Sequence, residues 1–529
     1  MNGKAFILEE YKGVSTMQGE TRFTLSRIAI IILSIFIQMV YIGVFVWYLA
    51  GFYMVGAVAT TVIAVGLVLW IVSRNINPSF KISWIILILV IPIFGILIYF
   101  LLGRPNLTKG LKVRGENAEK KLKPYVVFNK NISAALEKKN PSVSKQSKYL
   151  ERLGKFPVYT NTKTEYYAKT EDAFEELKNQ LRQAKSFIFM EYFIVADDSM
   201  WNEILDILKE KAAEGVEVRF IYDDMGSVTR LPYKYEKSLE KFGIQCRVFN
   251  PLMPLLAIVM NHRDHRKITV IDGIVGFTGG FNLADEYINR TSPHGLWKDA
   301  SVKIEGEAVA SFTAMFLQMW NSIKDSDSQE ECGKYFLEDY PDYKEDGMGY
   351  VQPYCDTPLD HECVGENVYL NMIQNAKKYV YCFTPYLILD NETIEAFCLA
   401  AKSGIDVRIV TPNIPDKKMV FRLSQSYYKP LINAGVRIFQ YEPGFIHSKC
   451  FLSDDKIAVC GTINLDYRSL YLHFECGCLL YHTKAVMQMK EDMEKTFRQS
   501  IEITKKFCDE TPFLRRVLQS ILTLFAPLL

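Results

Sequence analysis

Two short strings of this sequence combine residue types that can act on phosphate esters. In each string a His is followed by a Lys two residues later, by an Asp seven residues after the His, and then by Gly-x-x-Asn. A neutral imidazole can attack phosphorus, while Lys and Asn side chains neutralise the oxygens that gain negative charge in the transition state. The eight residues are His265, Lys267, Asp272 and Asn282 in the first string and His447, Lys449, Asp454 and Asn464 in the second.

The presence of two copies matters for the chemistry. One His cannot attack phosphorus and protonate the departing oxygen at the same instant, whereas two copies divide these roles, and the second His then accepts a proton from an incoming alcohol. A single His-x-Lys also fits a strand pair that has no chemistry. The whole pattern recurs at matching offsets in a chain with seven His, which favours a shared catalytic site.

Short apolar stretches follow both strings and must position them. Residues 268–271 and 274–277 flank a turn at Asp272, and residues 450–452 and 457–459 flank a turn at Asp454. Each string therefore predicts a strand, a turn and a strand. The His and Lys side chains are expected on one face, because residues two apart in a strand share a face.

Segments upstream of the two strings also repeat. Residues 215–219 correspond to 404–408, and residues 184–189 correspond to 376–381. The order of strand, helix, glycine turn, strand and catalytic string therefore occurs twice, which predicts two βα-rich lobes, each with a mixed α/β sheet, and a site at their seam. The upstream similarity alone does not require duplication, because a helix, a glycine and a valine-rich strand are common in βαβ units.

The paired strings resemble the two HKD motifs of the phospholipase D superfamily, and the chain resembles bacterial cardiolipin synthases from about residue 60 to its end. Further segments that carry the resemblance are residues 219–227, 261–267, 297–299, 461–469 and 526–529. The resemblance implies an α/β fold of two phospholipase D-like lobes with the active site at their interface, preceded by an N-terminal transmembrane helical region.

The resemblance also implies an activity and its partners. A phosphatidyl group would pass from one phosphatidylglycerol to another, giving cardiolipin and glycerol, with His265 as nucleophile and His447 as acid and then base. The substrates would be phosphatidylglycerol and membrane lipids. Neither a metal nor another cofactor is expected, because the lysines supply the positive charge. A membrane-bound hydrolase, a synthase with another alcohol or phospholipid as co-substrate, and a non-catalytic scaffold are the alternatives.

Further acids receive roles from the same resemblance. In the resembling enzymes an acid some way downstream orients each catalytic His, and this assigns Asp299, after the first His, and Glu475, after the second, as orienting residues. Asp272 and Asp454 belong to the catalytic motifs, and their positions at strand ends indicate that they brace the turns. Glu191 ends an apolar strand and is expected on the acceptor side of the site.

The N-terminal hundred residues differ in composition. Residues 28–50, 54–72 and 84–102 are almost wholly apolar, and each run is long enough to cross a hydrocarbon core of about 30 Å as a helix. Two to three membrane spans are predicted, and Pro92 and Gly95 make the third run a candidate re-entrant segment. The expected divisions are a membrane anchor (1–104), a basic juxtamembrane linker (105–150), the two lobes (151–330 and 331–510) and an amphipathic tail (511–529).

Charge and cysteine content place the catalytic body. Basic residues crowd just after residue 102, which favours the cytoplasmic face, although Arg22 and Arg27 before the first run favour the opposite orientation. The 11 cysteines show no CxxC pair, so a disulfide framework is not supported. The near-neutral balance of 62 Lys and Arg against 60 Asp and Glu argues against a nucleic-acid binder. The sequence leaves the oligomeric state open.

Two apolar segments have two interpretations each. Residues 249–260 contain two prolines and lead into the first string, which fits either a core strand or a wall that faces acyl chains. The last residues, 513–529, fit either an amphipathic helix in the membrane interface or a helix packed on the body.

Overall fold

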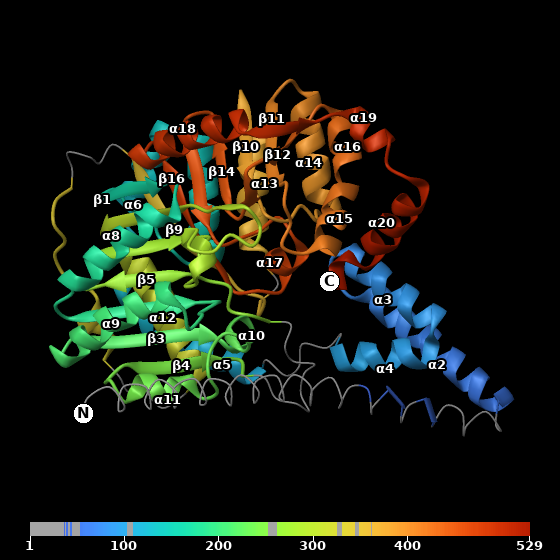
Figure 1. The fold of residues 1–529 in the computed structure, drawn as a ribbon, viewed down its shortest axis with the longest axis horizontal. Helices are drawn as coiled ribbons and strands as arrows, with labels where there is room; N and C mark the ends of the chain where they lie inside the picture. Colours follow the sequence, from blue (N-terminus) through green and yellow to red (C-terminus); the bar gives the residue numbers. More distant parts are fainter. Residues whose placement is uncertain are drawn as a thin grey trace, which may run out of the picture.

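The computed structural model of the chain describes isolated residues between 36 and 44, and then residues 53–102, 109–251, 262–324, 331–343, 349–360 and 362–528. The main body consists of two α/β lobes that lie side by side, with the N-terminal helices α2 to α4 beside the second lobe (Figure 1). Most of the predicted 249–260 segment lies outside the described residues.

The first lobe is built on a seven-stranded mixed sheet in the order β1-β8-β6-β5-β2-β3-β4. Helices α8 (Thr170–Gln183), α9 (Ser199–Ala213) and α12 (Val309–Ile323) belong to this lobe. The strands are β1 (Thr162–Tyr167), β2 (Phe187–Tyr192), β3 (Glu217–Asp223), β4 (Gln245–Phe249), β5 (Ile268–Ile271), β6 (Val275–Gly279) and β8 (Ser301–Gly306).

The second lobe has an eight-stranded sheet in the order β17-β12-β11-β10-β14-β15-β16-β9. Its helices include α13 (Val364–Asn375), α14 (Asn391–Lys402), α15 (Lys418–Ser426), α16 (Tyr428–Ala434), α17 (Tyr467–Tyr471) and α18 (Lys484–Arg498). The strands are β9 (Tyr350–Asp356), β10 (Tyr379–Phe383), β11 (Asp406–Pro412), β12 (Arg437–Tyr441), β14 (Cys450–Ser453), β15 (Ile457–Gly461), β16 (Glu475–Tyr481) and β17 (Ser500–Ile503).

The two sheets have the same plan. Read from β9 toward β12, the second sheet repeats the order of the first from β1 to β4, and β17 extends it. The pairings match as well, because β2–β3–β4 and β10–β11–β12 are parallel while both hairpins, β5–β6 and β14–β15, are antiparallel. The predicted pair of mixed α/β lobes and the predicted strand-turn-strand at each motif are therefore confirmed.

A shared apolar core joins the lobes. One continuous cluster contains Phe189 and Val302 from the first lobe together with Cys450, Ala458 and Cys478 from the second. A short parallel pair, β7 (Leu296–Lys298) with β13 (Gly444–Ile446), ties the segment before the second motif to the first lobe. The seam is thus a packed interior that holds both motifs in fixed positions.

The N-terminal apolar runs differ from the prediction. Residues 54–72 lie in helix α2 (Tyr53–Ser73), whereas residues 84–102 are divided between α3 (Pro78–Val90) and α4 (Pro92–Leu102), so a single straight third span is wrong. The break falls at Ile91, because a residue before proline avoids the helical region and Pro92 has no N–H to donate. Among the described residues, none of the helices combines the length and apolar character needed to span a bilayer. Most of the first predicted run, 28–50, falls outside them.

The described part of the predicted basic linker is helical, and its role as a linker stays a prediction. Helices α5 (Lys109–Leu122), α6 (Lys130–Lys139) and α7 (Pro141–Tyr149) pack on the body. They do so because each carries an apolar residue that is buried, namely Leu122, Leu136 and Val143. Helix α19 (Lys505–Asp509) leads to the C-terminal helix α20 (Phe513–Phe525), which lies along α15 and α3 (Figure 1).

Candidate active site

The two His-Lys pairs stand at equivalent places in the duplicated fold. His265 and Lys267 directly precede β5, and His447 and Lys449 directly precede β14. Each His segment hydrogen-bonds to the opposite lobe, since the His265 N–H donates to the carbonyl of Phe474 at 2.9 Å and the His447 N–H donates to that of Lys298 at 2.7 Å. The main chain thus brings both histidines to the seam.

The two orienting acids contact the imidazoles crosswise. His265 Nδ1 lies 2.9 Å and 3.0 Å from the two carboxylate oxygens of Glu475, and His447 Nδ1 lies 2.6 Å from Asp299 Oδ2. The order along the chain had associated each His with the acid downstream of it, and that pairing is wrong. The reason is the exchange of backbone hydrogen bonds described above, because Phe474 and Lys298 each directly precede the acid that the incoming His reaches.

The acids themselves are fixed by different neighbours. Glu475 also accepts a hydrogen bond from the Thr462 hydroxyl, whereas Asp299 accepts one from the Ala300 N–H at 2.8 Å. The residue equivalent to Thr462 is Gly280, and a Cβ added there would stand 2.0 Å from Asp299 Oδ1. Glycine is therefore required at position 280, because the Asp299 carboxylate occupies the space of a side chain. At the equivalent position, the Thr462 hydroxyl donates a hydrogen bond to Glu475.

The lysines are buried and point along their own motif. Lys267 Nζ donates to the His265 carbonyl at 2.6 Å, and Lys449 Nζ donates to the His447 carbonyl. Burial lowers the pKa of Lys267 to about 8 and that of Lys449 to about 7. An anionic phosphate between them would favour their charged forms, because an opposite charge stabilises the ammonium.

Burial also acts on the imidazoles and their acids. Burial, and then the Lys449 charge, lowers the pKa of His447 to about 4, and burial lowers the pKa of His265 well below its usual range. Burial alone would raise the pKa of Asp299, but the His447 and Lys449 charges hold it below its ordinary value. Burial raises the pKa of Glu475 well above its ordinary range, against the charge of Lys267. Both imidazoles are thus neutral at pH 7.

The two asparagines differ in how far they are engaged. Asn282 Oδ1 accepts from the Ile194 N–H at 3.0 Å, and its Nδ2 donates to the Tyr287 hydroxyl at 2.7 Å. Asn464 is 4 % exposed, and its Oδ1 has no hydrogen-bond partner among the described residues. Each retains at least one N–H that could face a phosphate, so their phosphate-binding role stays a prediction.

The motif aspartates do not reach the histidines. Asp272 accepts three backbone N–H groups, those of Lys185, Ser186 and Phe187, at 2.7–2.9 Å. Asp454 accepts the three equivalent N–H groups, from residues 377–379. Their placement among the catalytic residues is therefore corrected. They fasten the turn between two strands to the start of β2 or β10, as the bracing prediction expected.

Glu191 is buried and paired with Arg266, and its place on the acceptor side stays a prediction. Its side chain is fully buried at the end of β2, and Oε1 accepts from Arg266 Nε at 2.7 Å. Arg266 also reaches Asp264, at 3.4 Å. No pattern in the sequence indicates that the arginine between His265 and Lys267 points inward and requires a buried partner.

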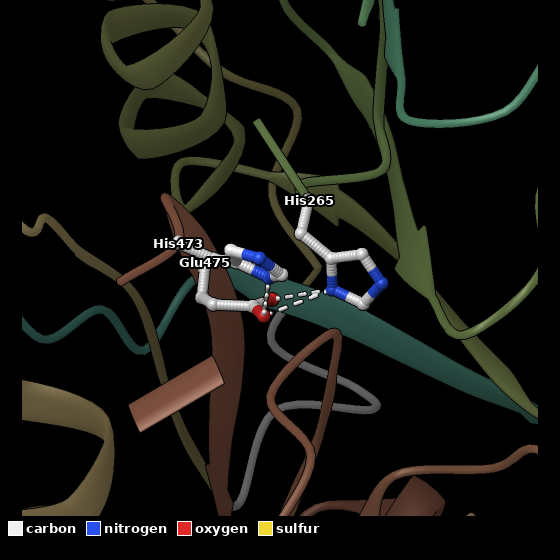
Figure 2. A group of neighbouring side chains, drawn as sticks. All are labelled: His265, His473 and Glu475. Atoms are coloured by element: carbon white, nitrogen blue, oxygen red, sulfur yellow. Dashed lines mark hydrogen bonds and ion pairs between the residues drawn. The ribbon is translucent and has the colours of Figure 1, made fainter. Parts of the chain in front are cut away.

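Sequence reasoning missed Gly280, Thr462 and His473. His473 stands two residues before Glu475, and its ring centroid lies 5.5 Å from that of His265 (Figure 2). The first two differ between the otherwise matching Gly-Gly-x-Asn and Gly-Thr-x-Asn strings, and this difference was the available signal. His473 offered no such signal, because only the fold brings it beside His265, which is 208 residues earlier in the chain.

The arrangement has the parts of a two-histidine phosphoryl-transfer site. Each neutral imidazole is held at Nδ1 by an acid, which leaves Nε2 for the reaction. Two lysines stand beside them as cations for the equatorial oxygens. Both histidines are about nine-tenths buried, at 7 % exposure each.

Comparisons with known proteins agree with this geometry. A family model described as "Cardiolipin synthase, PLD-like domain" matches residues 177–320 and 369–497, and one described as "Phospholipase_D-nuclease N-terminal" matches residues 62–104. A cardiolipin synthase of Halalkalibacterium halodurans is 33 % identical over 89 % of this chain and 93 % of its own length. One from Geobacillus kaustophilus is 35 % identical over 89 % of this chain and 92 % of its own length.

Two further likenesses are informative. An uncharacterized protein of Streptococcus mutans is 44 % identical over 88 % of this chain and 100 % of its own length. The crystal structure of a phosphatidylserine synthase from Haemophilus influenzae aligns with a TM-score of 0.54 and 16 % identity, covering 73 % of this chain and 98 % of that one. At such low identity the structural match supports the fold alone.

The duplicated α/β sheets and the paired His-Lys motifs at their seam define a phospholipase D-like, two-motif enzyme. Together with the matches over most of its length, they show that the chain belongs to the cardiolipin synthase family.

Proposed function

We propose that this enzyme is a cardiolipin synthase that transfers a phosphatidyl group from one phosphatidylglycerol to another, releasing glycerol. The observation that carries the proposal is the pair of crosswise His–carboxylate contacts, which present two imidazoles and two lysines at one buried seam. Family membership supplies the substrate class.

In the first step, His265 Nε2 forms a bond to phosphorus and the bond between phosphorus and the glycerol oxygen breaks. His447 donates the proton that the departing glycerol takes up, and an anionic phosphodiester nearby favours the protonated form needed for this. Lys267 and Lys449, with the free N–H groups of Asn282 and Asn464, hold the phosphoryl oxygens. A phosphatidyl-histidine and free glycerol result.

In the second step, the terminal hydroxyl of another phosphatidylglycerol gives its proton to His447. The hydroxyl oxygen then bonds to phosphorus as the bond between phosphorus and His265 breaks, which releases cardiolipin and restores the enzyme. Asp299 and Glu475 keep the ring proton on Nδ1 of each His, so that Nε2 remains the reacting atom.

The decisive experiment incubates purified protein in vesicles with phosphatidylglycerol as the only phospholipid. Cardiolipin and glycerol are expected in equal amounts, and His265→Ala should abolish both. Accumulation of phosphatidate would instead assign a hydrolase, because water would have taken the place of the second lipid. Product formed only after phosphatidylethanolamine or another alcohol is added would assign a different acceptor.

The surface of the N-terminal helices and of α20 supports a location at the membrane. On α2 to α4 the exposed apolar residues include Val62, Leu69, Leu89 and Ile93. Helix α20 directs Gln519 toward α15, where it donates to the Arg422 carbonyl, and leaves Phe513 and Leu514 75 % and 80 % exposed. Because Ser83 of α3 donates to the Leu524 carbonyl, the two apolar surfaces adjoin.

We therefore propose that α2 to α4 are part of a multi-pass anchor and that α20 lies in the adjoining membrane interface. Leu514→Asp should weaken binding to phosphatidylglycerol vesicles in a sedimentation assay, while Lys506→Asp, a change at an exposed residue of α19, should weaken it less. Equal losses would indicate a charge effect rather than insertion.

All 11 cysteines are free thiols, which supports a body at the cytoplasmic face. Protease should then cleave the body only in lysed spheroplasts.

A further inference from the structure

Beside the catalytic seam lies a cluster of three side chains that the transfer mechanism uses only in part. His265, His473 and Glu475 each offer a ligand atom, and these atoms all lie within 4.8 Å of one another. Both imidazoles face the same carboxylate, and their rings lie next to each other (Figure 2). The sequence showed no such group, because its members come from segments some 200 residues apart.

His473 is the member without a settled role. Its side chain is 10 % exposed, and its Nδ1 atom is buried, has no hydrogen-bond partner among the described residues, and lies 3.8 Å from Glu475 Oε1. That separation is too long for a hydrogen bond. Burial lowers the pKa of His473 well below its usual range, so the ring is neutral; because its Nε2 faces Arg468 Nε at 3.5 Å, a cation at Nδ1 must displace the ring proton. A buried, unpartnered nitrogen aimed at a carboxylate calls for a ligand between them.

We propose that His265 Nδ1, His473 Nδ1 and the Glu475 carboxylate form a binding site for a divalent cation of the Zn²⁺ class, and that occupancy inhibits turnover. Two nitrogens and one carboxylate form a donor set found in zinc sites with one open position. Ligand atoms around tetrahedral Zn²⁺ stand about 3.4 Å apart, given bond lengths of about 2.1 Å. The separations of 2.9 Å and 3.8 Å to Glu475 lie on either side of that value.

Inhibition follows from the imidazole tautomer. In the metal-free site Glu475 holds a proton on His265 Nδ1, and Nε2 has the lone pair that reacts. A cation at Nδ1 displaces that proton, and the neutral ring takes one up at Nε2 instead, so the count of protons on the ring is unchanged. The atom facing phosphorus is then an N–H. The binding does not depend on the proposed function, whereas the inhibition rests on it.

Among the residues that the structure describes, the other motif has no equivalent of this site. The residue that corresponds to His473 is Trp297, two positions before Asp299, whose ring centroid lies 5.2 Å from that of His447. Indole has no lone pair to offer a metal. Lys267 and Arg468 stand near His473 and oppose a cation, so affinity in the micromolar range is expected rather than that of a permanent structural site.

The test compares the full-length enzyme with His473→Asn. Co²⁺ should give the visible absorption of a tetrahedral complex and be displaced by Zn²⁺, and His473→Asn should weaken binding at least about tenfold, since even an outer-shell change costs that much. His482→Asn is the matched control, because His482 is exposed and its φ of 55° suits Asn. Mg²⁺ and Ca²⁺ should not compete, because they prefer oxygen ligands.

The activity arm uses cardiolipin formation at buffered Zn²⁺ concentrations. Wild type and His482→Asn should lose turnover at the Zn²⁺ concentration that displaces Co²⁺ from the site. His473→Asn should need at least tenfold more Zn²⁺ for the same loss of turnover. Equal inhibition or equal binding in His473→Asn and wild type would overturn the site. Binding without loss of turnover would overturn the inhibition. An enzyme that makes no cardiolipin would refute the proposed function while the Co²⁺ arm still decides the metal site.

Discussion

The crosswise pairing makes a prediction that the repeat alone would reverse. Asp299 lies in the first lobe but contacts His447 of the second, so Asp299→Asn should behave as a weakened His447 variant. Glu475→Gln should likewise behave as a weakened His265 variant. Under pairing within each lobe, the two assignments would be exchanged.

The size of the effect follows from the contact. His447 Nδ1 lies 2.6 Å from Asp299 Oδ2, and Asp299 is fully buried. A hydrogen bond to a charged group contributes about 1.5–3 kcal/mol, which corresponds to a rate loss of roughly 10- to 150-fold. The loss will be larger if the amide N–H turns toward the ring, because this favours the tautomer with its proton on Nε2.

The assay compares two phosphatidyl donors. Departure of glycerol from phosphatidylglycerol needs a proton, whereas departure of nitrophenolate from phosphatidyl-p-nitrophenol does not. The nitrophenolate burst should therefore be near normal in the variant that has lost the acid, and by the proposed mechanism this is His447→Ala. His265→Ala should show no burst. Asp206→Asn, at an exposed acid, is the control for the loss of a carboxylate.

The reasoning is tested by which variants resemble each other, whatever the roles of the two histidines. Asp299→Asn should share the donor dependence of His447→Ala, and Glu475→Gln that of His265→Ala. In a double-mutant cycle, adding Asp299→Asn to His447→Ala should cost less than twofold. If Asp299→Asn instead shared the donor dependence of His265→Ala, the crosswise contacts would be refuted as functional pairs.

Three further predictions follow from individual contacts. Gly280→Ala should lower kcat at least about tenfold, because its Cβ would stand 2.0 Å from Asp299 Oδ1, whereas Gly115→Ala, whose nearest neighbour is 3.9 Å away, should not. Asp272→Asn should lower the free energy of unfolding by about 1–3 kcal/mol in a denaturant titration, because one of its two acceptor oxygens is replaced by a donor, with kcat per folded molecule kept within about twofold. In a pH profile, kcat/KM should fall above the lysine pKa values of about 7 and 8, as the cations that bind phosphate are lost; a flat profile between pH 6 and 10 would contradict this.

The local parts of the site were predictable from the sequence. Strand β5 follows the His-x-Lys of the first motif because a run rich in β-branched residues, 268–271, precedes an Asp-Gly turn, and β14 follows the second because the apolar residues 450–452 come shortly before an Asp-Asp turn. The repeated order of elements along the chain was predictable too, since the segments 215–219 and 404–408 lead into the equivalent strands β3 and β11. Each of these inferences rests on short segments of about ten residues, either read alone or matched with the equivalent segment of the other repeat.

Contacts between the lobes were not predictable in this way. His447 meets an acid 148 residues earlier, and His265 meets one 210 residues later. A spacing along one chain cannot distinguish pairing within a lobe from exchange between lobes, because both place an acid downstream of a His. The buried contact of Glu191 was unpredictable for a related reason, because the sequence shows its partner Arg266 only as the middle residue of a motif.

The backbone of the duplicated site is symmetric, whereas the residues around the two acids that contact the imidazoles differ. One half pairs His447 with an aspartate whose pKa is held low, next to Gly280 and Trp297; the other pairs His265 with a glutamate whose pKa burial raises, next to Thr462 and His473. In a two-step transfer one His must bond to phosphorus while the other carries protons, so identical surroundings would serve neither role well. Because the differences lie in the residues that contact the acids, we expect exchange of Gly280 and Thr462 between the lobes to impair turnover even though each residue type is already present in the site.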